Sequence, residues 1–186
     1  MNWNDHSSLE GCHSIFSPSS YSWINYSNEK AAEFYKNMKA KEYGTRLHAY
    51  AAESIRLKQK LPKSNKTLNM YVNDAIGFNM KPEQILFYSI NFFGTADAIC
   101  FKRDFLRIHD LKTGVTKASL HQLECYAALF CLEYDIKPGD IKTELRIYQN
   151  DDILIGNPGA DDILPIMDKI ITFNKIIENI QEEDYE

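Results

Sequence analysis

Long apolar runs are missing from this sequence, and none approaches the ~20 residues needed to span a bilayer. The first residues also lack the basic and apolar parts of a secretory signal. No repeat, low-complexity segment or linker is visible in the sequence. These absences argue against membrane, secreted and repeat proteins, so we expect a cytoplasmic protein with no membrane partner.

Paired cysteines are absent too. The four cysteines, Cys12, Cys100, Cys125 and Cys131, form no C-x-x-C pair. This excludes the common zinc and redox motifs that use such pairs. We therefore expect buried, reduced thiols rather than disulfides or a metal cluster.

An overall excess of positive charge is also lacking, because the formal net charge is −5. The charges are unevenly distributed, however. Residues 30–66 hold ten Lys and Arg against three Glu, whereas residues 150–186 hold ten Asp and Glu against two Lys. The first stretch is suited to a phosphate backbone and the second would repel it. Solvated helices that simply carry lysines explain the first stretch nearly as well.

The composition itself is that of a globular domain, with 44% hydrophobic and 25% charged residues in 186. Hydrophobic periodicity predicts helices over residues 29–40, 44–60, 66–77, 118–134 and 161–181. It predicts strands over residues 84–90, 92–101, 105–112 and 141–149. Residues 1–14 are expected to form a loose arm and residues 182–186 a frayed acidic tail.

This order of elements predicts one α/β domain over residues 1–186, with a central mixed sheet of about four strands flanked by helices. The first three strands follow one another closely and should be antiparallel. The last strand comes after a helix, which predicts a crossover connection.

Two acidic residues stand out in the predicted hairpin. Asp97 lies within the strand 92–101, and Asp110 lies near the end of the next strand, two residues before Lys112. Side chains two apart on a strand share a face, so Asp110 and Lys112 should point the same way and Asp97 could face them.

Carboxylates this close repel each other unless a cation lies between them. Mg²⁺ takes oxygen ligands, and a bound metal ion can activate water and neutralise charge on a phosphate. The pattern therefore suggests metal-assisted phosphodiester hydrolysis. The alternative is a hairpin with charged residues at its solvated ends, since an Asp-x-Lys tripeptide often occurs by chance.

Two predicted helices add polar candidates. His48 flanks an apolar stripe in the helix 44–60, where it is either a packed core residue or a metal ligand that would favour Mn²⁺ as well as Mg²⁺. Gln122 and Tyr126 are four apart in the helix 118–134 and share a face. They form either the polar edge of that helix or a pair that points toward the acidic residues.

Five motifs, in this order, resemble those of the PD-(D/E)XK nuclease superfamily, in particular its RecB-like and phage-type exonuclease branch. The resemblance runs from about Phe16 to Tyr134, most of the chain. The five matching segments are Phe16-Ser-Pro-Ser-Ser20, Gly44-Thr-x-x-His48, Gly94-Thr-Ala-Asp97, Asp110-Leu-Lys112-Thr-Gly and Gln122-x-x-x-Tyr126.

The resemblance implies a restriction-endonuclease-like αβββαβ core and a set of roles. It makes His48, Asp97 and Asp110 ligands of Mg²⁺ or Mn²⁺, with the carbonyl of Leu111 as a further ligand. Lys112 would position the attacking water and stabilise the phosphate. The last pair, Gln122 and Tyr126, would support the lysine or hold DNA, and Glu53 is a weaker helical candidate.

The sequence departs from the family pattern in several ways. No cysteine follows Cys131, so no Fe–S cluster is expected, and no helicase segment is present. Ala96 stands where proline often precedes the first acidic residue. The acidic C-terminal stretch is not a feature of the family.

We therefore expect a stand-alone, metal-dependent deoxyribonuclease, foremost an exonuclease of phage-type DNA recombination or processing. An endonuclease of the same fold and a non-catalytic DNA- or protein-binding subunit are the alternatives. The expected partner is DNA, together with a recombination or single-strand-binding protein. Self-association is compatible with the resemblance, and a phage-encoded protein would act in the host cytoplasm.

Overall fold

The computed structural model describes residues 4–183. The chain divides into two compact units, Met1–Tyr43 and Gly44–Glu186. The boundary lies inside helix α1 (Asn28–Arg56). All the candidate catalytic and metal-binding residues predicted from the sequence belong to the second unit.

The first unit is built from short helical turns and the beginning of α1. Residues 4–14 are exposed and contain one 3-10 turn, η1 (Ser7–Leu9). A second 3-10 segment follows, η2 (Pro18–Asn25), which is kinked at Ser20. The ring of Trp23 packs on Phe16, with ring centroids 6.0 Å apart.

The two helices predicted over residues 29–40 and 44–60 are one continuous helix, so that prediction was wrong. Gly44, taken as the start of the second helix, lies inside α1 and is buried. A Cβ atom at Gly44 would lie 2.8 Å from Oγ1 of Thr113. Glycine is used here for a close approach between α1 and the chain after the third strand, and the helix tolerates it.

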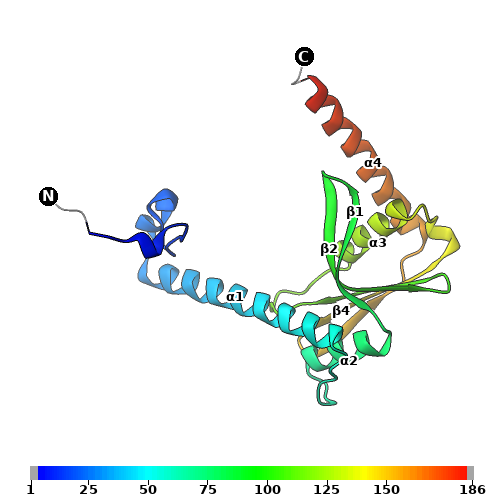
Figure 1. Cartoon of the computed structure of the whole chain (residues 1–186), viewed down its shortest axis with the longest axis horizontal. Helices are drawn as coiled ribbons and strands as arrows, with labels where there is room; N and C mark the ends of the chain where they lie inside the picture. The colour runs from blue at the N-terminus through cyan, green and yellow to red at the C-terminus, as the bar shows by residue number, and fades with distance from the viewer. Residues whose placement is uncertain (1–3, 184–186) are drawn as a thin grey trace. The chain divides into compact units, whose positions relative to one another are not determined.

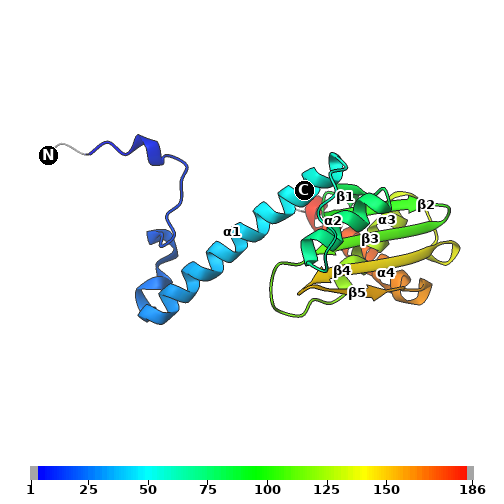
Figure 2. The ribbon, with the colours of Figure 1, turned by 90° about the horizontal axis from the view of Figure 1, so that it is seen from below.

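The second unit contains a five-stranded mixed sheet. Its strands are β1 (Lys81–Ser89), β2 (Phe92–Lys102), β3 (Phe105–Leu111), β4 (Lys142–Gln149) and β5 (Asp152–Gly156), in the spatial order β1-β2-β3-β4-β5. Figure 2 shows this order, and Figure 1 shows β1 and β2 as one long twisted hairpin. Neighbouring strands are antiparallel except β3 and β4, which are parallel.

Strand β5 was not predicted, and it raises the expected four strands to five. It pairs with β4 through a turn at Asn150 and Asp151, whose φ angles are 53° and 61°. Asn and Asp tolerate this left-handed region, which favours a two-residue hairpin. The five-residue strand is too short to show a clear alternation in the sequence.

Helices cover both faces of the sheet. Helices α3 (His121–Glu133) and α4 (Ala160–Glu183) pack on one face, where Leu123 and Ile163 meet Ile108. On the other face, α2 (Thr67–Gly77) and the last turns of α1 pack on Leu111 and Tyr148. The second unit is therefore a three-layer α/β structure, as the sequence predicted.

The bounds of other elements differ from the predicted ones by a few residues. Helix α3 begins three residues later than expected, and a 3-10 turn, η3 (Pro138–Asp140), precedes β4. Residues 182 and 183 belong to α4, whereas residues 184–186 of the expected frayed tail lie outside the described residues. None of the helices in residues 4–183 has the length and apolarity to span a membrane.

The cysteines are free thiols, but they are not all buried as expected. Cys131 is buried and Cys100 is half-buried, whereas Cys12 and Cys125 are exposed.

Candidate functional site

The strand register places the two acidic residues of the hairpin opposite each other. Ala98 pairs with His109 at the end of the β2–β3 ladder, so Asp97 and Asp110 are the next pair along. The ladder stops there because the backbone N–H of Leu111 donates to Oδ2 of Asp97, at 2.9 Å. Asp110 is only 3% exposed. Two carboxylates therefore meet at the end of this strand pair.

Asp110 begins a chain of polar contacts that includes three further predicted residues. Nζ of Lys112 lies 3.1 Å from Oδ1 and 3.0 Å from Oδ2 of Asp110. The same ammonium donates to Oε1 of Gln122 at 2.8 Å. The amide of Gln122 donates in turn to the hydroxyl of Tyr126 at 3.3 Å. The residues from β3 and α3 are thus connected as the spacing suggested.

Asp97 belongs to a second group of possible ligands. One ligand atom each of His48, Glu83 and Asp97 lies within 4.8 Å of the other two. Nδ1 of His48 is 3.3 Å from Oδ2 of Asp97. Carboxylate oxygens and an imidazole nitrogen suit Mg²⁺ or Mn²⁺. His48 therefore faces the acidic residues rather than only packing in the core.

Glu83 is the site residue that the sequence reasoning missed. The predicted strand began at Gln84, one residue too late, and no motif includes Glu83. In the structure Pro82 pairs with Ala98 and Gln84 with Ala96, so Glu83 faces Asp97. No signal in the sequence pointed to this, because the register shifts between Phe87 and Ser89, and counting back from the Ser89–Phe92 pair would put Gln84 opposite Asp97.

The backbone at Glu83 is strained. Its φ angle is 51°, in the left-handed region, although it lies inside a strand and is not glycine. Such a conformation costs on the order of 1–3 kcal/mol and is concentrated at functional sites. The β1–β2 ladder contains no backbone pair between Glu83 and Asp97, although the residues on either side are paired. Glu83 and Asp97 face each other at this gap in the ladder.

The carboxylates of the site repel one another, and burial together with this repulsion shifts the pKa values of two of them. Burial, followed by repulsion from Asp97, raises the pKa of Asp110, although Lys112 acts in the opposite direction. Desolvation and the charge of Asp97 also raise the pKa of Glu83. The hydrogen bond with Asp97 raises the pKa of His48. Cationic charge among these groups would relieve this repulsion.

A metal ion fits these residues. Oδ2 of Asp110 is buried and accepts no hydrogen bond from any described residue, although it lies beside the Lys112 ammonium. The ligand atoms of His48, Glu83 and Asp97 lie within 4.8 Å of one another, and Asp97 is the residue opposite Asp110 on the neighbouring strand. The Lys112 ammonium is the one cationic group that the described residues place against Oδ2 of Asp110, and a metal ion would share the carboxylate with it. The carbonyl of Leu111 remains a predicted ligand, since the contact observed at Leu111 is made by its N–H.

Two motif glycines make room for site residues. A Cβ atom at Gly94 would lie 2.9 Å from Cε1 of Tyr126. The absence of a Cβ atom at Gly44 likewise leaves space for Thr113, the residue that follows Lys112. Both glycines therefore serve close packing around the site, whereas neither has a positive φ angle.

The loop that links Lys112 to α3 is held by one side chain. Nε2 of Gln149 donates to the carbonyls of Gly114 and Thr116, at 2.6 and 2.8 Å. Its Oε1 accepts from the N–H of Ala118 at 3.1 Å. Gln149 thus fixes the segment between Lys112 and Gln122, and no motif pointed to it.

Glu53, the weaker candidate on α1, does not join the site. It is exposed, and Oε2 of Glu53 lies 3.4 Å from Arg56. The spacing of five residues from His48 turns it away from the face that His48 occupies.

Searches with protein-family models, curated proteins and solved structures found no significant match.

Proposed function

We propose that this protein is a metal-dependent deoxyribonuclease that hydrolyses phosphodiester bonds at the site formed by His48, Glu83, Asp97, Asp110 and Lys112. The observation that carries the proposal is the convergence of three carboxylates and an imidazole beside a lysine. A purely structural cluster would gain nothing from a strained Glu83 and a buried Asp110 carboxylate at the same end of the sheet.

The topology supports the same proposal. Three antiparallel strands are followed by the crossover helix α3 and by β4, which is parallel to β3. This is the order expected of the αβββαβ nuclease core that the motifs resemble. In this order, the site residues come from α1, β1, β2, β3 and α3, and all gather at one end of the β2–β3 pair.

Each side chain has a role in this chemistry. A divalent ion held by His48, Glu83, Asp97 and Asp110 would supply Lewis acidity for attack by water on phosphorus. Lys112 contributes a charged donor for a non-bridging phosphate oxygen. Gln122 keeps that ammonium at the site through its 2.8 Å contact, and Tyr126 orients Gln122.

An exonuclease is the form of the activity that the motifs favour, acting on DNA ends during recombination or processing. The carboxylates among the proposed ligands suit Mg²⁺, and the imidazole of His48 would add affinity for Mn²⁺. A restriction-type endonuclease would use the same residues. Cleavage of linear against covalently closed circular DNA distinguishes the two activities.

The test is digestion of end-labelled linear DNA and of covalently closed circular DNA, with Mg²⁺, Mn²⁺ or EDTA. Wild type is compared with Asp110→Asn and with the control Asp104→Asn. Asp104 lies in the β2–β3 turn with a φ angle of 58°, which Asn tolerates. Both substitutions remove one carboxylate charge, but only the first removes it from the site.

The proposal predicts metal-dependent loss of linear DNA by wild type and by Asp104→Asn, and none by Asp110→Asn. Resistance of the circular substrate indicates an exonuclease, and cleavage of both substrates indicates an endonuclease. A folded wild-type protein that cleaves neither substrate with either ion would contradict the proposal and favour a non-catalytic binding protein.

A further inference from the structure

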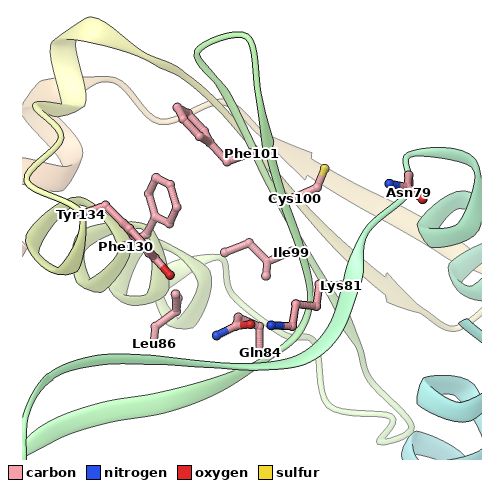
Figure 3. A pocket seen from close by; sticks show the side chains of 9 residues that line it. All are labelled: Asn79, Lys81, Gln84, Leu86, Ile99, Cys100, Phe101, Phe130 and Tyr134. Atoms are coloured by element: carbon pink, nitrogen blue, oxygen red, sulfur yellow. The ribbon is translucent and has the colours of Figure 1, made fainter. Parts of the chain in front are cut away.

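A second concave site lies on the same β1–β2 hairpin as Glu83 and Asp97. It is a pocket of about 350 Å³ between β1, β2 and the end of α3. Figure 3 shows its lining: Asn79, Lys81, Gln84, Leu86, Ile99, Cys100, Phe101, Phe130 and Tyr134. The volume lies within the range of ~300–1,000 Å³ typical of small-ligand sites.

One wall of the pocket is aromatic. The ring centroids of Phe101 and Phe130 are 5.1 Å apart, and those of Phe130 and Tyr134 are 4.9 Å apart. Phe130 is buried, whereas Phe101 is 40% and Tyr134 51% exposed. Two aromatic rings are therefore open to solvent around an apolar floor. Exposed rings of this kind provide faces on which a flat, conjugated ligand can stack.

The rest of the lining is polar. Lys81 and Gln84 project from β1 in Figure 3, across from Phe130 of α3 and from Tyr134, which directly follows α3. Lys81 is the single charged residue of the lining, so the pocket carries a positive charge. The amides of Asn79 and Gln84 offer both donors and acceptors. A ligand with an aromatic ring, hydrogen-bonding edges and an anionic group matches this combination.

The position of the pocket relates it to the acidic site. Asp97 and Phe101 both lie on β2, four residues apart. At about 3.3 Å per residue, Phe101 is about 13 Å along the strand from Asp97. One strand of a duplex advances about 3.4 Å per nucleotide, so this distance corresponds to about four nucleotides.

We propose that this pocket is a nucleotide subsite, which stacks one base of a DNA strand on Phe101 and Tyr134 and holds a phosphate with Lys81. This inference rests on the proposed function, because it places the strand whose backbone reaches the acidic site. The bound base belongs to a nucleotide about four positions from the scissile bond.

The test measures binding of a fluorescent single-stranded oligonucleotide in EDTA, where no cleavage occurs. Wild type is compared with Phe101→Ala, Tyr134→Ala and the control Phe87→Ala. Phe87 is an exposed aromatic residue of the same hairpin, outside the pocket lining. We expect each pocket variant to bind about tenfold more weakly and the control to bind like wild type. Thermal unfolding of each variant confirms that it is folded.

A series of oligonucleotides, each with one abasic position, then locates the base. One position should weaken binding to wild type about tenfold, and at that position wild type and Tyr134→Ala should bind equally. Lys81→Gln should instead lower the slope of log affinity against log salt by about 0.7, whatever the base. The aromatic variants should leave this slope unchanged.

Three results would overturn the subsite. The first is that the pocket variants bind no more weakly than Phe87→Ala. The second is that no abasic position affects wild type and Tyr134→Ala differently. The third is that a free deoxynucleoside monophosphate competes as well as the oligonucleotide, which indicates a free-nucleotide site. Failure of the nuclease proposal looks different, because wild type would then lack metal-dependent cleavage while these binding differences persist.

Discussion

Glu83 faces Asp97 across the β1–β2 hairpin at a point where the ladder between the strands is interrupted. The pairs on either side, Pro82 with Ala98 and Gln84 with Ala96, are intact. Between them the backbone of Glu83 turns into the left-handed region, with φ at 51°. This local distortion brings a third carboxylate to the site, and the predictions below depend on it and on its neighbours.

Glu83→Gln should weaken Mn²⁺ binding by at least about tenfold, because it removes an anionic ligand while keeping the size of the side chain. Isothermal titration calorimetry with Mn²⁺ measures this change. Glu53→Gln is the matched control, since Glu53 is exposed and pairs with Arg56. Equal Mn²⁺ affinities for the two variants would show that Glu83 is not a ligand.

Asp110→Asn should stabilise the metal-free protein while removing its activity. Burial and repulsion from Asp97 raise the pKa of Asp110, so its charged form is unfavourable in the folded state. An amide relieves both effects, and we expect a gain of about 1 kcal/mol in the free energy of unfolding at neutral pH. Urea denaturation in EDTA measures this gain. A marked loss of stability would mean that the Asp110–Lys112 pair is needed for folding.

Gly94→Ala should destabilise the protein by about 1–2 kcal/mol, because the new methyl group would meet the ring of Tyr126. The cost should disappear in a Tyr126→Ala background, which a double-mutant cycle of urea denaturation tests. Gly114→Ala is the control, since a Cβ atom there meets nothing within 4 Å. An unchanged cost in the Tyr126→Ala background would assign it to the backbone instead.

Gln149→Glu should loosen the loop between Lys112 and α3. The substitution keeps the shape of the side chain but replaces the group that donates to Gly114 and Thr116. We expect faster hydrogen–deuterium exchange in residues 113–118 and a lower cleavage rate at unchanged Mn²⁺ affinity. Gln181→Glu, at an exposed position of α4, is the control. Unchanged exchange in this loop would count against the role of Gln149.

His109 should make the metal-free protein sensitive to acid. Burial first, and then the charges of Arg146 and Arg107, lower the pKa of His109 to about 3. In the unfolded chain the imidazole of His109 binds a proton near pH 6.5. Between about pH 6.5 and 3 the unfolded chain thus binds a proton that the folded protein does not bind. The free energy of unfolding should therefore fall as the pH falls from about 6.5 toward 3, by at most about 1.4 kcal/mol per pH unit.

Urea denaturation in EDTA across this pH range measures that dependence. His109→Gln should remove this part of the slope, whereas His121→Gln, at an exposed position, should keep it. Equal slopes for wild type and His109→Gln would show that His109 is protonated in the folded protein as readily as in the unfolded chain.

The sequence predicted the layers of the fold because hydrophobic periodicity reports which face of each element is buried. The three-strand meander and the parallel β4 followed from connection lengths. Gly44 was misread because a helix tolerates glycine where it must pass Thr113 closely, a tertiary contact that local sequence does not report. Strand β5 was missed because five residues are too few to show a period.

The site was predictable where its residues occupy regular positions. Lys112 follows Asp110 by two, and Tyr126 follows Gln122 by four, so strand and helix geometry brought them together. Glu83 was not predictable in this way, because it reaches the site through pairing with a strand 14 residues away and through an irregular φ angle. Gln149 acts through loop carbonyls, which carry no side-chain pattern.

The most direct test is the rate of cleavage of end-labelled DNA against Mg²⁺ concentration, for wild type, Asp97→Asn and Asp104→Asn. Asn at position 97 keeps an oxygen that can accept from the N–H of Leu111, so it removes the charge and spares the backbone contact. We predict saturable, Mg²⁺-dependent cleavage by wild type and Asp104→Asn, and a rate at least about 100-fold lower for Asp97→Asn. Equal rates for Asp97→Asn and wild type, or cleavage that persists in EDTA, would contradict a metal-dependent nuclease site at these carboxylates.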